Sequence, residues 1–326
     1  MNSLIQRSKI PVTLVTGFLG SGKTTFINNL LKENQQAKIA IIENEFGDIS
    51  IDSRLIANYK PESILELNNG CICCSLFNEF SMALQELIRQ NDHFEQLIIE
   101  TTGIADPEPI IEPFFRDADL MRLFEFRGTI CLVDSLNFQE EIGQFEQLKQ
   151  IILSDLVILN KTSGVNNEKL THIRRKITAL NSTAQLIETD FGTVDLLQLN
   201  LLHAQIQDDL AKKLRKPIFC EPEGHRFYSF SIRFGGSVEE NRFREWFAYF
   251  VSFYRKKIFR IKGLLLLENS PVYSVVQAVG GTFSITEGTM INPFETPENV
   301  LVFIGKDISK FEIEKMFDEF LYPEPD

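Results

Sequence analysis

The stretch Ile10-Pro-Val-Thr-Leu-Val-Thr-Gly17-Phe-Leu-Gly20-Ser21-Gly22-Lys23-Thr24 decides the fold of this chain. Its first seven residues form an apolar, β-branched run that predicts a buried strand, and residues 24–32 have a helical pattern. The glycine-rich part between them fits the phosphate-binding loop pattern. Glycines let backbone N–H groups surround phosphate oxygens, and the helix N-terminus adds a partial positive charge. We therefore expect Lys23 to contact the β- and γ-phosphates of a nucleotide and the Thr24 hydroxyl to coordinate Mg²⁺.

Outward from this stretch, short apolar runs alternate with helical stretches as far as about residue 202. The runs consist mostly of Val, Ile and Leu, as expected for strands buried on both faces of a parallel sheet. Strands are predicted at residues 10–16, 39–43, 97–100, 128–133 and 156–160, and helices at 24–32, 78–90 and 169–180. This alternation predicts a doubly wound α/β domain, of the P-loop NTPase type, over residues 1–210.

A change of composition predicts a linker at residues 211–224, where four basic residues precede Pro217, Pro222 and Gly224. Beyond it, residues 225–326 form a smaller α+β domain. Strands are predicted at 227–234, 258–267, 272–279 and 300–304, and a last helix at 309–321. Ser237, with Glu240 three residues later, predicts a capping box for a helix that continues to about Tyr254.

Composition and charge exclude several classes of protein. The chain has 326 residues, of which 44% are hydrophobic and 24% charged, and this excludes a disordered, collagen-like or coiled-coil chain. Its formal net charge is -12, from 33 Lys and Arg against 45 Asp and Glu. An acidic chain without a long basic run is expected to bind neither nucleic acid nor an anionic membrane. Five cysteines, an odd number, and no apparent secretory signal predict a cytoplasmic protein.

Three of these cysteines lie together in Asn69-Gly-Cys71-Ile-Cys73-Cys74-Ser75. Thiolates are soft ligands that suit Zn²⁺ or Cu(I). Three thiolates with an open fourth position are more typical of a metal-transfer site than of a closed structural site. The alternative is a redox-reactive or simply packed cysteine group. Cys131 and Cys220 are interpreted as ordinary residues.

Two acidic segments follow predicted strands. Glu100, in Glu100-Thr-Thr-Gly103, is expected to bind Mg²⁺ through water or to orient the attacking water, and Gly103 lets the backbone approach the γ-phosphate. The segment Glu43-Asn-Glu-Phe-Gly-Asp48 supplies carboxylates for a hard cation or for a thiolate site. The alternatives are a capping glutamate at position 100 and a solvated loop at 43–48.

A possible base-recognition motif, Asn160-Lys161-Thr162-Ser163, follows the last predicted strand of the first domain. It is similar to the guanine-recognising Asn-Lys-x-Asp of GTPases, but Ser163 stands where the aspartate belongs. A serine hydroxyl accepts hydrogen bonds more weakly than a carboxylate, so we expect GTP to be preferred over ATP by a reduced margin. We also expect Ser163→Asp to raise that preference. The alternative is an ordinary turn at the end of a strand.

Together these motifs resemble those of the CobW family of P-loop GTPases, and the likeness covers nearly the whole chain. It includes Asp106-Pro107, the stretch Thr189-Asp-Phe-Gly192-Thr-Val-Asp195, and Val302-Phe-Ile-Gly305 near the end of the chain. The resemblance implies slow GTP hydrolysis coupled to the binding of Zn²⁺, or a related transition metal, and to its delivery to a client metalloprotein. The histidine-rich tract of many relatives is absent, so metal storage on such a tract is not expected.

The resemblance also implies roles for individual residues. Cys71, Cys73 and Cys74 match the metal thiolates, Glu100 matches the hydrolytic carboxylate, and Glu43 and Asp48 are auxiliary ligands of the metal or of Mg²⁺. The GTP-binding residues implied by position are Gly17, Gly20, Ser21, Gly22, Lys23, Thr24, Thr25, Gly103, Asn160, Lys161 and Ser163. Two other functions stay open: a metal- or redox-sensing protein with vestigial hydrolysis, and, ranked last, a P-loop ATPase or kinase. Whether the chain forms a homodimer also stays open.

Overall fold

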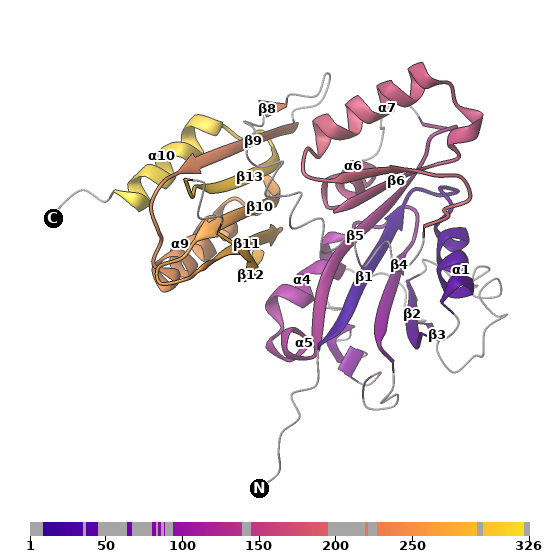
Figure 1. Cartoon of the computed structure of the whole chain (residues 1–326), viewed down its shortest axis with the longest axis horizontal. Coiled ribbons are helices and arrows are strands. Elements are labelled where there is room, and N and C mark those ends of the chain that lie inside the picture. Colours follow the sequence, from indigo (N-terminus) through magenta and orange to yellow (C-terminus); the bar gives the residue numbers. More distant parts are fainter. Residues whose placement is uncertain are drawn as a thin grey trace, which may run out of the picture.

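The computed structural model describes residues 9–34, 37–44, 64–66, 80–82, 84–85, 88, 94–138, 145–194, 219–220, 227–291 and 296–322. These residues form two β-sheets, each packed against helices (Figure 1). In this part of the chain no helix combines the length and the apolar character needed to cross a membrane.

The first sheet has the strand order β3-β2-β4-β1-β5-β6-β7, and all its pairings are parallel. Its strands are β1 (Ile10–Gly17), β2 (Ile39–Asn44), β3 (Ile64–Glu66), β4 (Gln96–Thr101), β5 (Phe124–Asp134), β6 (Leu156–Asn160) and β7 (Gln185–Glu188). Because parallel strands end at the same edge of a sheet, the segments after β1, β4, β5, β6 and β7 lie along one edge.

Helices cover both faces of this sheet. They are α1 (Lys23–Glu33), α4 (Glu108–Arg116), α5 (Ala118–Leu123), α6 (Phe145–Ile152) and α7 (Asn167–Leu180). Alternate residues of β1 point to opposite faces: Val15 packs with Phe26 of α1, whereas Leu14 belongs to the core that includes residues of α4, α6 and α7. The doubly wound α/β architecture predicted from the sequence is therefore confirmed.

The second sheet has the order β12-β11-β10-β13-β9-β8 and is antiparallel. Its elements are β8 (Phe219–Cys220), β9 (Phe227–Phe234), α9 (Glu240–Phe253), β10 (Ile258–Leu266), β11 (Val272–Val279), β12 (Thr282–Met290), β13 (Asn299–Lys306) and α10 (Lys310–Leu321). The predicted α+β class of this part is also confirmed. The strand β8 lies inside the segment predicted as a linker, and the linker's other residues are outside the described part of the chain.

The cap of α9 differs from the prediction. The side chain of Glu239, not that of Ser237, accepts hydrogen bonds from the N–H groups of Asn241 and Arg242. The cause is the neighbouring Val238, which forms an isolated bridge with Leu267 and therefore stays extended. The helix begins after this bridge, and the capping position moves one residue past it.

The two sheets share a continuous core through alternate residues of β13. Val300, Val302 and Ile304 belong to the core that contains α4, α6 and α7, whereas Leu301 and Phe303 pack with α9 and α10. One face of the second sheet thus lies on the helices of the first domain (Figure 1), and the other carries α9 and α10. The second domain is docked through apolar packing rather than tethered by the linker alone.

Three buried charges also join the two domains. The carboxylate of Asp155, just before β6, accepts hydrogen bonds from Arg260 at 2.5 Å and from Lys262, both on β10. It also accepts the N–H of Thr129 at 2.9 Å. Burial raises the pKa of Asp155, but the charges of Arg260 and Lys262 outweigh it and lower that pKa from 3.8 to about 2. The aspartate therefore stays charged in the interface.

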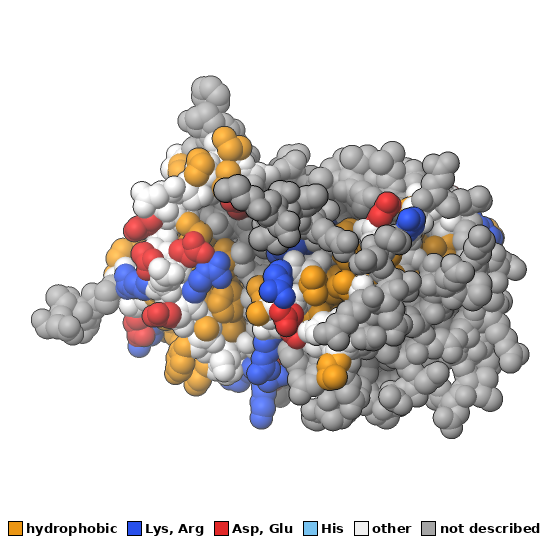
Figure 2. All heavy atoms as spheres, turned by 90° about the horizontal axis from the view of Figure 1, so that it is seen from below, with side chains coloured by type: hydrophobic (Ala, Val, Ile, Leu, Met, Phe, Trp, Pro, Cys, Tyr) orange, Lys and Arg blue, Asp and Glu red, His pale blue; other side chains and the backbone are white. Residues whose placement is uncertain are grey.

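The exposed surface carries charges of both signs. On the face drawn in Figure 2, described acidic and basic side chains are interspersed with apolar ones, most clearly over the second domain. On this face, the described atoms show no extended area of basic side chains.

Candidate nucleotide-binding site

The glycine-rich loop joins β1 to α1 in the way that its sequence predicts. Gly22 caps α1 with a φ of 102°, in the left-handed region that favours glycine. A Cβ atom at this position would lie 2.4 Å from Nδ2 of Asn160, so no other residue fits without displacing that amide. Ser21 is buried, and its N–H donates to the Phe18 carbonyl oxygen at 3.1 Å. The loop therefore presents its backbone at the N-terminus of a helix, as anion binding requires.

Lys23 and Thr24 begin helix α1 at this loop. The Lys23 amino group donates to the carbonyl oxygens of Gly17 at 2.9 Å and Phe18 at 3.3 Å, so its charge lies against the loop. The Thr24 hydroxyl donates to Oε1 of Glu100 at 3.4 Å. The adjacent Thr25 is exposed on α1.

Glu100 brings a buried carboxylate to the same place from β4. The neighbouring pair of hydroxyls, Thr101 and Thr16, is hydrogen-bonded at 2.8 Å and ties β4 to β1. On its other side β4 pairs with β2 in a register that sets Glu43 opposite Glu100 along the backbone. The Thr24 hydroxyl and the Glu100 carboxylate are the hard oxygen donors that Mg²⁺ prefers, so this site fits the ion.

The loop that follows β4 packs directly on the phosphate-binding loop. A Cβ atom at Gly103 would lie 2.5 Å from the backbone nitrogen of Leu19, so this close approach requires glycine. From α6, the Gln150 side chain donates to the carbonyl oxygens of Gly103 at 3.3 Å and Ala105 at 3.1 Å. A change in the position of the phosphate-binding loop would therefore displace the Gly103 loop and, through Gln150, affect α6.

Lys149, next to Gln150 on α6, contacts both the segment after Gly103 and the second domain. Its amino group bonds to the carboxylates of Asp106 at 2.5 Å and Glu108 at 2.6 Å. It also lies 5.5 Å from the ring centroids of Phe145 and of Phe259, the latter on β10. Burial lowers the pKa of Lys149, but the two carboxylates outweigh it and raise that pKa above its usual value. Lys149 is therefore charged, and it links α6 to the start of α4 and to β10.

Asn160 and Lys161 close the site from the end of β6. The buried Asn160 amide donates to the Ser21 carbonyl oxygen at 2.9 Å and accepts the Gly192 N–H at 3.0 Å. Lys161 donates to the carbonyl oxygen of Gly20 at 2.7 Å and to Oδ2 of Asp134 at 2.6 Å. Both residues thus tie the end of β6 to the phosphate-binding loop.

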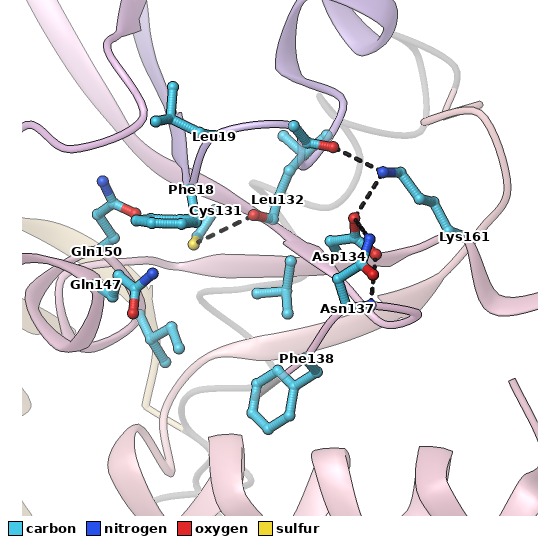
Figure 3. Close-up of a pocket in the computed structure, with 13 residues that line it drawn as sticks. Phe18, Leu19, Cys131, Leu132, Asp134, Asn137, Phe138, Gln147, Gln150 and Lys161 are labelled. Carbon is cyan, nitrogen blue, oxygen red and sulfur yellow. Dashed lines mark hydrogen bonds and ion pairs between the residues drawn. The ribbon is translucent and has the colours of Figure 1, made fainter. Parts of the chain in front are cut away.

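Asp134 holds Lys161 in place. Burial raises the pKa of the Asp134 carboxyl, but hydrogen bonds from Lys161 and Asn137 outweigh it and lower that pKa below its usual value. In Figure 3 the Lys161 side chain reaches between Asp134 and the loop. The pair lines one side of a cavity of about 290 Å³, whose other walls include Phe18, Phe138 and Gln150. Lys23 and Thr24 are not among its lining residues, so this cavity lies beside the phosphate-binding position.

Ser163 lies in a short 3-10 turn, Thr162–Gly164, where its backbone and side chain contact Asp190. The same carboxylate accepts a hydrogen bond from the Thr162 hydroxyl at 3.4 Å. The structure thus places a carboxylate beside the serine that replaces the expected aspartate.

The proposed metal ligands cannot be placed. Asp48, Cys71, Cys73 and Cys74 lie outside the described residues, and of Glu43 only the backbone is described. Within the described ranges, no three His, Cys, Asp or Glu side chains are grouped so that they could bind a metal. Cys131 is buried in β5, and burial raises the pKa of its thiol to about 12 despite the charge of Lys23.

Sequence reasoning missed Asp134, Lys149 and Gln150, and it noted Asp190 only as part of the stretch from Thr189 to Asp195, without a role. Asp134 ends β5, and Asp190 follows β7 by two residues, so both lie at the edge where the parallel strands end. A polar residue at or near the C-terminal end of a parallel strand was the signal for them. Lys149 and Gln150 are buried on α6, a helix that was not predicted, and no local pattern marks them.

Comparison with known proteins follows the same division into two parts. Residues 11–188 match the family model described as the CobW/HypB/UreG nucleotide-binding domain. Residues 227–321 match the model described as the cobalamin synthesis protein cobW C-terminal domain.

Among individual relatives, the zinc chaperone YjiA of Escherichia coli (strain K12) is 32% identical over 316 residues, 94% of this chain and 98% of that protein. The zinc chaperone CobW of Sinorhizobium sp is 28% identical, over 84% of this chain and 86% of that protein. The crystal structure of Zn(II)-bound YjiA GTPase from E. coli matches with a TM-score of 0.67 at 24% identity, over 96% of this chain and 99% of that chain. That structure supports the fold.

Proposed function

Because this chain belongs to the CobW family, we propose that it is a cytoplasmic, nucleotide-dependent metallochaperone. It hydrolyses GTP slowly and delivers Zn²⁺, or a related transition metal, to a client metalloprotein. The names of its relatives, zinc chaperones among them, support zinc as the cargo.

One observation carries the nucleotide part of this proposal: three elements converge on a single loop. Lys23 and Thr24 come from α1, Glu100 from β4, and Asn160 with Lys161 from β6. Phosphoryl transfer needs charge beside the phosphates and a positioned nucleophile. Selection of GTP also needs a site that fixes the guanine base. In our proposal Lys23 supplies the charge, Glu100 orients the attacking water, and Lys161 and Asn160 fix the base.

Mg²⁺ would be bound by the Thr24 hydroxyl and, directly or through water, by Glu100. When bound, it supplies charge that neutralises the phosphate oxygens. Glu43, whose backbone lies opposite Glu100, and Asp48 are further candidates for this ion or for the cargo metal.

The cargo site is assigned to the thiolates of Cys71, Cys73 and Cys74. In sequence these residues lie between β2 and β4, the strands that end beside the nucleotide. This segment begins directly after β2, whose Glu43 lies opposite Glu100 along the backbone, so it is well placed to change metal exposure when the nucleotide changes.

The second domain responds through α6. The loop at Gly103 is bonded to Gln150, and the adjacent Lys149 bonds to Asp106 and Glu108 and packs on Phe259 of the second domain. In our proposal, release of the Gly103 loop after hydrolysis moves these contacts and changes the surface offered to the client.

A multiple-turnover GTPase assay with and without Zn²⁺ tests this function. Lys23→Ala is expected to abolish phosphate release while far-UV circular dichroism stays unchanged, because Lys23 supplies charge beside the phosphates, whereas Phe26 and Ile27 pack α1 into the core. Lys32→Ala, at an exposed position of the same helix, is the matched control and should retain full activity. If the wild type stays at the Lys23→Ala background under both conditions, the chain is not a working GTPase. The sensing protein with vestigial hydrolysis then replaces this proposal.

A further inference from the structure

The structure places a carboxylate where the base-recognition motif lacks one. The Ser163 N–H donates to both Asp190 oxygens, at 3.0 Å and 3.2 Å, and the Ser163 hydroxyl donates to Oδ1 at 3.1 Å. Asp190 is only partly buried, and Ser163 is exposed, so a ligand can reach both.

We propose that Asp190 is the specificity-determining residue for the guanine base, in place of the aspartate expected at position 163. This inference rests on the proposed function, since it requires that GTP is the substrate. The guanine-binding carboxylate would then follow β7 instead of the neighbouring strand β6.

Two contacts of the residues that follow Asp190 fix its position relative to the phosphate-binding loop. The Gly192 N–H donates to Asn160, whose amide in turn donates to the Ser21 carbonyl oxygen in that loop. The Phe191 carbonyl oxygen accepts the side-chain amide of Asn29 on α1 at 2.7 Å. A base bound between Lys161 and these residues would therefore meet a carboxylate that is already oriented.

The chemistry of the guanine edge suits this group. Guanine offers two neighbouring donors, its ring N1–H and its 2-amino group, and a carboxylate has about four acceptor positions. The Ser163 N–H and the hydroxyls of Ser163 and Thr162 occupy Asp190 in the structure, and the two hydroxyls can rotate to other acceptors when a base binds. Adenine has an acceptor at N1 and no 2-amino group, so it would leave the carboxylate unpaired. Hydrogen bonds to charged groups favour the matching base roughly ten- to a hundredfold each.

The role proposed for Asp190 and the sequence-based expectation for Ser163 predict different effects of Ser163→Asp on the preference for GTP. If the chain lacks a guanine-binding carboxylate, Ser163→Asp raises the preference for GTP. If Asp190 already supplies it, Ser163→Asp adds little, because a second carboxylate beside the first is repelled by it.

The decisive experiment is a competition titration of GTP, ATP and XTP against the full-length chain with Mg²⁺. In Asp190→Asn we expect the GTP-to-ATP preference to fall at least tenfold. The affinity for XTP should rise, because an asparagine amide can donate to the 2-carbonyl of xanthine while accepting its N1–H. A role confined to stabilising the turn at Ser163 would not produce this gain for XTP.

Two further variants complete the design. Adding Ser163→Asp to Asp190→Asn returns a carboxylate to the same place and should restore the GTP preference. Asp318→Asn, at an exposed position of α10, is the control and should change none of the three affinities.

The outcomes separate this inference from the proposed function. A wild type that binds no nucleoside triphosphate overturns both. A wild type that hydrolyses GTP but does not prefer it to ATP overturns the role of Asp190 alone. The same holds if Asp190→Asn keeps the wild-type GTP preference and gains no XTP binding.

Discussion

Replacing Asp155 by asparagine removes one negative charge from a buried cluster and keeps the shape of the side chain. Asp155 is 4% exposed, and its partners Arg260 and Lys262 are 3% and 2% exposed. The asparagine oxygen can still accept the Thr129 N–H, which now bonds to Asp155 at 2.9 Å. The substitution therefore isolates the charge that joins the two domains.

The expected loss of stability follows from the burial of the two cations that remain. Removing one partner of a buried ion pair costs about 3–5 kcal/mol, because the other charge is left uncompensated. The pKa of Asp155 gives a second figure. Its fall from 3.8 to about 2 corresponds to about 2–3 kcal/mol between the charged and neutral forms of this side chain. We therefore expect Asp155→Asn to lower the free energy of unfolding by 2–5 kcal/mol.

Equilibrium unfolding in urea at pH 7 measures this loss. Trp246, the single tryptophan, contacts Phe317 and Phe320 in the second domain, so its fluorescence reports on that domain. Far-UV circular dichroism reports on the whole chain. Glu125→Gln, which breaks an exposed ion pair with Arg127, is the control and should cost less than about 1 kcal/mol.

The cause can be checked with a second substitution and with pH. Lys262→Met, added to Asp155→Asn, removes one of the two buried cations that faced Asp155 and should recover part of the loss. The folded state holds the pKa of Asp155 below its unfolded value of 3.8, so this stabilisation is complete above about pH 5 and is lost as the pH falls through the folded pKa of about 2. The variant should lack this part of the pH dependence. An Asp155→Asn protein within 1 kcal/mol of the wild type would refute the reasoning.

Two remaining predictions concern the metal and the contact between domains. Changing Cys71, Cys73 and Cys74 together to serine should remove about one tightly bound Zn²⁺ per chain, because serine is a poor ligand for soft metals. Metal analysis measures this stoichiometry. The affinity of the wild type for Zn²⁺ should weaken as the pH falls, because the thiols become protonated. Lys149→Met should speed amide hydrogen exchange in residues 103–108, because Asp106 and Glu108 lose their shared cation, whereas Lys149→Arg keeps the charge and should not. Unchanged stoichiometry or unchanged exchange would contradict the respective prediction.

The sequence was sufficient for those parts of the site that lie in one local pattern. The phosphate-binding loop and α1 could be predicted because glycines, lysine and the following helix are contiguous. The strands β1, β4 and β6 could be predicted because buried parallel strands are continuous apolar runs. β7 and β12 were missed, since β7 has four residues and many side chains of β12 are exposed or half-buried. Neither shows the uninterrupted apolar run by which β1, β4 and β6 were found.

Contacts between distant residues could not be predicted. Ser163 suggested a missing carboxylate because the motif was considered alone, and Asp190 lies 27 residues further along the chain. Its proximity depends on β7 pairing beside β6, which no local pattern specifies. The same applies to Asp155 and Arg260, which are separated by 105 residues and meet because β10 packs against α6 of the first domain.

The two charged contacts between the domains differ in burial, and this limits how the second domain can respond to the nucleotide. The Asp155 cluster is almost fully buried, so separating the domains there would expose or strand three charges. The Lys149 cluster is less buried, since the Asp106 side chain is 31% exposed, and it is bonded to the loop that contacts the phosphate-binding loop. Small movements of residues 103–108 are therefore far less costly than detachment of the domain. In the proposed cycle the second domain stays docked at Asp155, and only the surface around Lys149 changes with the nucleotide.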